Sequence, residues 1–230
     1  MAVSIDTVYQ RVLTILNKEQ RGYLTPEEYN LFANQAQLDI FEQYFYDINQ
    51  FSRMPGNDTE YSDMLGLLNE KISLFETTSV LTHTGSYYTI PTDLYRVGTV
   101  IYNNAEAEKT NKNEYLYITS SPITAPGNDF PIYTKDTNGI KVYGSAEITS
   151  SSDVSLTYIK KPSKATWNYT SVLGNAQYTA TGSVNFELHP SEETELVTKI
   201  LGLAGLLLQD MGIYQVASAE ENKDIQQQKS

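Results

Sequence analysis

The sequence of 230 residues contains no cysteine. A disulfide framework and a thiolate metal site are therefore excluded, and the chain suits a reducing compartment. Long apolar runs are also missing: residues 200–208 form a run about half the length of the roughly 20 residues that a membrane-spanning helix needs. The first residues lack the basic and then apolar segments of a signal peptide. We therefore expect synthesis in the cytoplasm and no membrane partner.

Positive charge is scarce, with 16 Lys and Arg against 28 Asp and Glu and a net charge of -12. Binding to phosphates needs clustered Lys and Arg that release counterions, so this balance argues against a protein that grips nucleic acid. The chain has 18 Tyr. Tyrosine is favoured at protein interfaces and carbohydrate sites, although its preference for strands would also account for the number.

Residues 1–78 have the periodicity of helices. Apolar residues recur at helical spacing within residues 8–16, 32–48 and 61–75. The sequence Thr25-Pro26-Glu27-Glu28 marks a helix start, because Thr can cap, Pro suits the first helical position and Glu28 can complete a capping box. We predict an N-terminal helical segment of three helices that pack in a bundle.

Residues 79–188 change character and are rich in Tyr, Thr, Val, Ile, Gly and Asn. Segments 87–90, 139–143 and 154–158 alternate as strands do. Turn signals such as Asn103-Asn104, Thr137-Asn138-Gly139 and Gly174-Asn175 separate them. We predict that these residues form an inserted antiparallel β domain.

Helical signals return at His189-Pro190, where Glu192 and Glu193 suit a first helical turn. Residues 196–211 are hydrophobic nearly all round, so we expect a long helix over residues 189–216 at the centre of the bundle. Gly202 and Gly205 could admit a close neighbour. The predicted fold class is α+β, a helical bundle from N-terminal helices plus a long C-terminal helix, with an inserted antiparallel β domain.

Residues 217–230 form a polar tail that is too poor in apolar side chains to fold alone. We predict that this tail is mobile in the free subunit and becomes ordered against a partner. Four apolar residues in and before the tail offer a thin stripe that the partner could cover, and they are the candidate interface: Ile213, Tyr214, Val216 and Ile225.

The sequence gives little support for catalysis, a cofactor or a metal site. It has no glycine-rich phosphate loop, nucleophile elbow or histidine pair on one helical face. The pairs Glu27-Glu28 and Glu192-Glu193 lie at predicted helix starts, where unpaired N–H groups favour carboxylates, and Glu220-Glu221 lies in the tail. We therefore expect no enzymatic activity. Trp167 either anchors the core or a loop, or serves as a platform for a sugar ring.

Short motifs follow one another in a fixed order after the predicted helices. The β region opens with residues 88–97 (YTIPTDLYRV), followed by Phe130-Pro131-Ile132-Tyr133, the hairpin segment 139–143 (GIKVY) and residues 156–162 (LTYIKKP). Residues 186–193 (FELHPSEE) precede the last apolar helix. This order resembles the tail tubular protein A type adaptors of short-tailed phages and the related ring proteins of crAss-like phages. The Gln- and Tyr-rich helix at residues 34–51 and the Gln-rich tail depart from those adaptors.

The resemblance implies a virion structural protein of the tail or neck region, a head-to-tail adaptor that forms a closed, twelve-fold ring between portal and tail. Its partners would be further copies of itself, the portal protein and an adjacent tail ring or tail protein. Genomic DNA would pass through the channel without specific binding, since an acidic lumen repels phosphates. The alternative is a tail-associated carbohydrate-binding or adhesin module that uses Tyr and Trp167 as stacking platforms.

Overall fold

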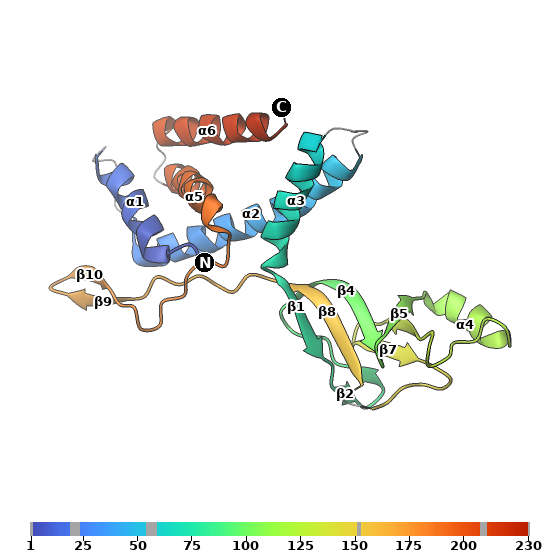
Figure 1. Ribbon diagram of the computed structural model, residues 1–230. Coiled ribbons are helices and arrows are strands. Elements are labelled where there is room, and N and C mark those ends of the chain that lie inside the picture. Colours follow the sequence, from blue (N-terminus) through green and yellow to red (C-terminus); the bar gives the residue numbers. More distant parts are fainter. Residues whose placement is uncertain (1, 19–23, 54–58, 151–152, 208–210, 230) are drawn as a thin grey trace. The chain divides into compact units, whose positions relative to one another are not determined.

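The computed structural model describes residues 2–18, 24–53, 59–150, 153–207 and 211–229. The chain is mixed α+β, with helices at both ends of the sequence and a β region inserted between them, as predicted. It divides into two compact units (Figure 1). The helical unit comprises Met1–Leu74 and Pro162–Ser230, and the β unit comprises Phe75–Lys161. None of the helices that the structure describes is long and apolar enough to cross a bilayer.

The helical unit contains five α-helices and one 3-10 turn within the described residues: α1 (Ile5–Lys18), α2 (Pro26–Arg53), α3 (Thr59–Ser73), η1 (Pro190–Glu192), α5 (Glu193–Leu207) and α6 (Met211–Lys229). The predicted capping box at the start of α2 is confirmed. The backbone N–H of Thr25 donates to the Glu28 carboxylate at 2.9 Å, and the N–H of Glu28 donates to Thr25 Oγ1 at 3.3 Å. These two contacts satisfy donors that a helix start otherwise leaves free.

The core of the helical unit follows the predicted apolar faces of α1, α2 and α5. Its buried members include Val8, Val12, Leu16, Ala33, Ala36, Ile40, Phe41, Leu196, Ile200 and Ala204. The expected single helix over 189–216 is instead two helices, because α5 ends at Leu207 and α6 begins at Met211. Leu206 and Leu207, in the last turn of α5, are 56% and 48% exposed. The expectation of a helix buried all round is therefore wrong for that turn.

Residues 162–188 were expected in the β domain but belong to the helical unit. They include the hairpin of β9 (Tyr169–Val172) and β10 (Asn175–Tyr178). The first part, residues 163–167, lies along α2, where side-chain amides bond its backbone. Asn34 Nδ2 donates to the carbonyl of Ala165 at 2.8 Å, and the N–H of Ala165 donates to Asn34 Oδ1 at 3.0 Å. These bonds attach the segment to the helices.

Asn30 and Gln37 extend this set of contacts in both directions along α2. Asn30 bonds both the N–H and the carbonyl of Trp167, at 2.8 and 3.1 Å. Gln37 Nε2 donates to the carbonyl of Ser163 at 2.8 Å, and Gln37 Oε1 accepts from the N–H of Glu187 at 3.2 Å. We call Asn30, Asn34 and Gln37 the amide ladder.

The β unit is an eight-stranded sheet in the order β1-β8-β4-β5-β6-β7-β3-β2. Its strands are β1 (Glu76–Val80), β2 (His83–Thr84), β3 (Tyr87–Tyr88), β4 (Leu94–Tyr102), β5 (Ala105–Lys109), β6 (Ile132–Lys135), β7 (Ile140–Tyr143) and β8 (Val154–Lys160). The predicted strands at 139–143 and 154–158 are confirmed as β7 and β8. The apolar core of the β unit includes Leu81, Tyr88, Val100, Ile140, Val142, Val154 and Leu156.

The sequence predicted an antiparallel sheet, but the sheet is mixed. Strands β5 and β6 pair in parallel, whereas the other pairings are antiparallel. Parallel neighbours need a crossover connection, and the chain supplies one through α4 (Lys112–Ser120). This helix was not predicted, although Asn111 and Glu114 form a capping box at its start.

Candidate functional site

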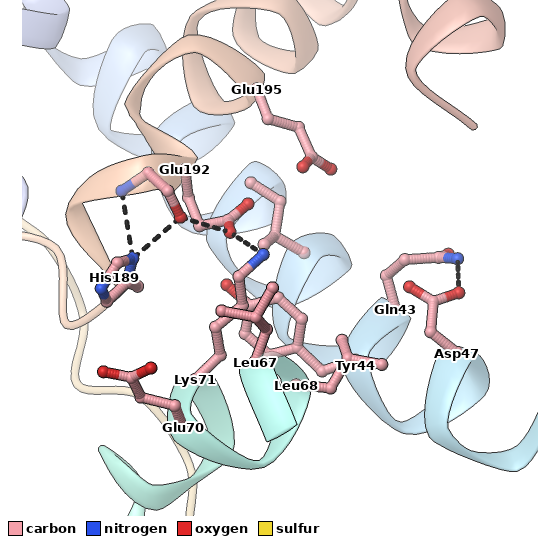
Figure 2. A pocket seen from close by; sticks show the side chains of 12 residues that line it. Gln43, Tyr44, Asp47, Leu67, Leu68, Glu70, Lys71, His189, Glu192 and Glu195 are labelled. Atoms are coloured by element: carbon pink, nitrogen blue, oxygen red, sulfur yellow. Dashed lines mark hydrogen bonds and ion pairs between the residues drawn. The ribbon is translucent and has the colours of Figure 1, made fainter. Parts of the chain in front are cut away.

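A pocket of about 300 Å³ in the helical unit is lined by residues of α2, α3, η1 and α5 (Figure 2). One part of its lining is apolar and includes Ile40, Leu67 and Leu68. Lys71 and Glu192 bring opposite charges to the same pocket. Both are partly or fully removed from solvent, so their interaction is stronger than that of a surface pair.

The Lys71–Glu192 ion pair joins the last turn of α3 to the turn that precedes α5. Lys71 Nζ lies 2.5 Å from Glu192 Oε1, and the Glu192 side chain is only 4% exposed. Ser191 Oγ also donates to Glu192 Oε1, at 3.1 Å. Burial favours the protonated carboxyl, but the hydrogen bond and charge of Lys71 outweigh it, so the pKa of Glu192 is lowered. Glu192 therefore carries a charge in the folded protein.

Glu195 lies one turn further along α5 and behaves differently. Burial, and then the hydrogen bond and negative charge of Glu192, raise the pKa of Glu195 to about 7. The ammonium group of Lys199, 3.8 Å away, opposes this effect only in part. Two neighbouring carboxyls thus differ in protonation near neutral pH because Lys71 neutralises one of them.

Tyr44 of α2 lies beside this pair. Its ring centroid is 5.5 Å from Lys71 Nζ, within the range of a cation–π contact. The Tyr44 hydroxyl is buried. Burial and the charges of Glu192 and Glu195 raise the pKa of Tyr44, so the phenol stays protonated. Lys71 therefore contacts both a carboxylate and an aromatic face.

The two histidines have local contacts only. His189 Nδ1 accepts a hydrogen bond from the N–H of Ser191 at 3.2 Å and lies 2.8 Å from Ser191 Oγ. This arrangement caps the turn η1. His83 pairs with Tyr88 between β2 and β3, in the other unit. His189 thus fixes the start of α5, while the Lys71–Glu192 pair joins that start to α3.

The four residues of the predicted partner interface fall in α6. Tyr214 and Val216 lie on α6 and are 37% and 71% exposed. Because they are two residues apart in a helix, they point to different sides and do not form one stripe. The side chains of Ile213 and Ile225 lie outside the described residues. The boundary predicted at residue 217 falls inside α6, where residues 211–229 are helical.

Gly202 of α5, one of the two glycines expected to admit a close neighbour, lies against α6 at an ordinary van der Waals distance. A Cβ atom built on Gly202 would lie 3.7 Å from the Cβ of Ala217 on α6, and Ala217 is buried. Lys199 and Glu221 add an ion pair of 2.6 Å between the same two helices. Residues expected to lie in a polar tail therefore pack against α5 in this structure.

Trp167 is a core anchor and not a platform for sugars. Its side chain is 1% exposed, its ring centroid lies 4.0 Å from that of Tyr9, and its indole N–H donates to Asp6 Oδ1 at 2.9 Å. A ring buried in this way has no free face for a ligand. The anchoring interpretation of Trp167 is therefore confirmed.

Several exposed apolar side chains went unnoticed in the sequence. In the helical unit, Leu173 at the tip of the β9–β10 hairpin is 99% exposed. In the β unit, none of the residues of α4 is buried, and four large side chains on and after this helix are between 65% and 94% exposed: Leu116, Tyr117, Ile123 and Phe130. The group on and after α4 is close together in the sequence, and exposed apolar side chains that gather on one surface are typical of contact surfaces.

Comparison with known proteins gives no further indication of function. No protein-family model and no curated protein matches this sequence. Within the described residues, no group of three or more His, Asp or Glu side chains is placed to hold a metal ion.

Proposed function

We propose that this chain is a virion structural protein of a tailed bacteriophage, a subunit of the ring that joins portal and tail and lines the DNA ejection channel. The observation that carries the proposal is that both units leave large apolar side chains exposed on peripheral elements. In the helical unit this is Leu173, and in the β unit Ile123 and Phe130. A subunit that assembles with copies and with neighbouring rings needs such contact surfaces.

The motifs that carry the resemblance to phage adaptors also contact one another, which supports the proposal. Asp93, from the first motif (residues 88–97), accepts a hydrogen bond of 3.0 Å from the hydroxyl of Tyr158 in the fourth motif (residues 156–162). The carbonyl of Asp93 accepts from the N–H of Lys161 at 2.7 Å. The motif residues thus have structural roles in one part of the β unit, which agrees with a family defined by structural motifs.

The pocket of the helical unit is consistent with a structural role as well. Its charged residues join helices, because Lys71 and Glu192 connect α3 to the start of α5. The net charge of -12 further suits a channel-lining protein, since DNA phosphates would not adhere to it. The alternative adhesin function loses its main candidate platform with the burial of Trp167.

The test is the assembly state of the purified chain. Mass photometry and negative-stain electron microscopy should show closed rings of one size, with twelve copies, alone or after addition of the portal protein of the same phage. A chain that stays monomeric in both conditions would contradict the proposal. A glycan-binding screen of the same sample separates the alternative, because sugar binding by a monomer would favour the adhesin.

A further inference from the structure

The hairpin of β9 and β10 stands apart from the helices of its own unit (Figure 1). Its strands pair in the register Tyr169↔Tyr178 to Val172↔Asn175 and form a separate two-stranded sheet. Two-stranded hairpins are marginally stable without further support. We call residues 169–178 the arm.

The base of the arm is firmly attached. The rings of Tyr169 and Tyr178 each lie 5.8 Å from the ring of the buried Trp167. Beside them, the N–H of Thr179 donates to the carbonyl of Asn168 at 2.9 Å. The arm is therefore held in place at one end while its tip extends away from these contacts.

The tip of the arm holds a leucine in a conformation that leucine rarely adopts. Leu173 has φ of 52° and Gly174 has φ of 84°, so both residues of the two-residue turn are left-handed. Asn-Gly is the preferred pair for such a turn, because Asn and Gly tolerate the left-handed backbone conformation. Leucine rarely adopts this conformation. Leu173 is also 99% exposed, so its side chain gains almost no packing against the described residues that would offset the strain or the exposure.

The charge pattern indicates what kind of molecule the arm can approach. Residues 165–186 contain no Asp, Glu, Lys, Arg or His, the longest such run in a chain of net charge -12. Two copies of an acidic chain repel each other wherever their charged surfaces meet. An uncharged arm can contact a second copy without that repulsion.

We propose that the arm joins one copy of this chain to the next, with the Leu173 side chain buried in the contact. This inference rests on the proposed ring function and names the element that would build the ring. A contact between an arm on one copy and a different surface on the next is heterologous, and such contacts close into rings when the rotation allows it.

The first experiment is Leu173→Asn, with assembly and stability measured in parallel. Asparagine suits the left-handed turn, so the melting temperature of the unassembled subunit should stay equal or rise. Loss of a buried leucine should raise the dissociation constant between subunits by about tenfold to a hundredfold. A purely structural role for Leu173 predicts the opposite pattern, a lower melting temperature with unchanged assembly.

The matched control is Leu31→Asn, which alters a leucine of the same unit that is 71% exposed on α2. Assembly of this variant should equal that of the wild type. Equal loss of assembly in both variants would mean that the arm has no special part in the contact, and would contradict the inference.

The absence of cysteine allows the contact to be mapped directly. A benzophenone maleimide attached to the full chain at Leu173→Cys should, on irradiation, link one copy covalently to a second. Crosslinks exclusively to the portal protein, or within one chain, would overturn the inference. If the wild type forms rings and Leu173→Asn forms them equally well, the arm inference fails while the ring function stands. A wild type that never assembles contradicts the ring function itself.

Discussion

The contacts inside the helical unit differ in kind from those inside the β unit. In the β unit most of the buried residues form one apolar cluster, which includes Tyr88, Val100, Ile140 and Leu156. The helical unit has an apolar core as well, but two of its connections are polar: the amide ladder and the Lys71–Glu192 pair. Polar contacts have strict geometry, so they specify which segments lie side by side.

The amide ladder shows how this specification works. Its members, Asn30, Asn34 and Gln37, recur about once per helical turn and meet every second residue from Trp167 back to Ser163. The helical steps of four and three residues advance about 6 and 4.5 Å, and each step of two extended residues advances about 6.6 Å, so the two spacings are similar enough for long amide side chains to reach the segment. A segment that lies outside the helices and the named strands thereby obtains a fixed register on α2.

The largest expected effect comes from Lys71→Met, which leaves the Glu192 carboxylate buried without its cation. We expect the free energy of unfolding to fall by about 3 kcal/mol, the lower end of the range for breaking a buried pair, because Lys71 is one-quarter exposed. Urea unfolding followed by Trp167 fluorescence measures it, since this single tryptophan reports on the helical unit.

A double variant, Lys71→Met with Glu192→Met, provides the control for this prediction. Replacing both partners by apolar side chains removes the unpaired charge, so most of the lost stability should return. If the double variant is as unstable as Lys71→Met alone, the pair is not the source of the effect.

Asn34→Ala should have the next largest effect. It removes both hydrogen bonds between Asn34 and Ala165 and leaves the N–H and carbonyl of Ala165, a residue 1% exposed, without these partners. Unsatisfied buried groups cost about 1–3 kcal/mol each, and we expect a total loss of about 2 kcal/mol after some relaxation. The control Gln35→Ala, which removes an exposed contact with Asp39, should change stability by less than about 0.5 kcal/mol. Equal losses of stability in the two variants would show that the amide ladder contributes no more to stability than an exposed side-chain contact does.

The same ladder explains why the domain boundary was predicted wrongly. The polar residues Asn30, Asn34 and Gln37 resemble a solvent-facing side of α2, and nothing in residues 162–168 has a helical or strand period. Periodicity identifies elements that bury an apolar face. It gives no sign of an extended segment held by side-chain amides, so residues 162–188 were assigned to the β domain instead of the helical unit.

Other elements were predictable because their signals are local. The capping box at Thr25 located the start of α2, and alternation located β7 and β8. The helix α4 was missed although Asn111 and Glu114 give a comparable signal, because the surrounding residues are rich in Tyr, Ile and Thr, which favour strands. With α4 unrecognised, the parallel pairing of β5 and β6 could not be expected.

The candidate pocket was only partly visible in the sequence. Glu192 was expected at a helix start, and it does lie in the turn before α5. Its partner Lys71 is far away in the sequence, and the two come together because α3 and α5 both pack against α2. Long-range pairing of this kind leaves no trace in local patterns.

An effect of similar size to that of Asn34→Ala should appear in the pH dependence of the helical unit. The pKa of Glu195 is raised to about 7, so the folded state holds this proton more tightly than the unfolded state. The resulting stabilisation is complete below the ordinary carboxyl value of about 4.5 and is lost as pH rises through about 7. We expect the wild type to lose about 2 kcal/mol relative to Glu195→Gln between pH 5 and pH 8.

Urea unfolding of the wild type and Glu195→Gln at the two pH values measures this difference. The contributions of titratable groups that both proteins share cancel in the comparison. Glu220→Gln, which alters an exposed carboxylate on α6, is the control and should follow the wild type. Parallel pH profiles for the wild type and Glu195→Gln would show that Glu195 does not hold its proton near neutral pH.

The smallest expected effect concerns α6, where sequence and structure differ most. Composition predicts a tail that is mobile in the free subunit, whereas the structure has Glu221 paired with Lys199 and Ala217 packed at Gly202. Glu221 is 42% exposed, so Glu221→Gln should weaken the docking of α6 by no more than about 1 kcal/mol. Hydrogen exchange of the α6 amides in the unassembled subunit should then quicken by up to about fivefold. Unprotected α6 amides in the wild type would instead mean that the helix docks only on assembly.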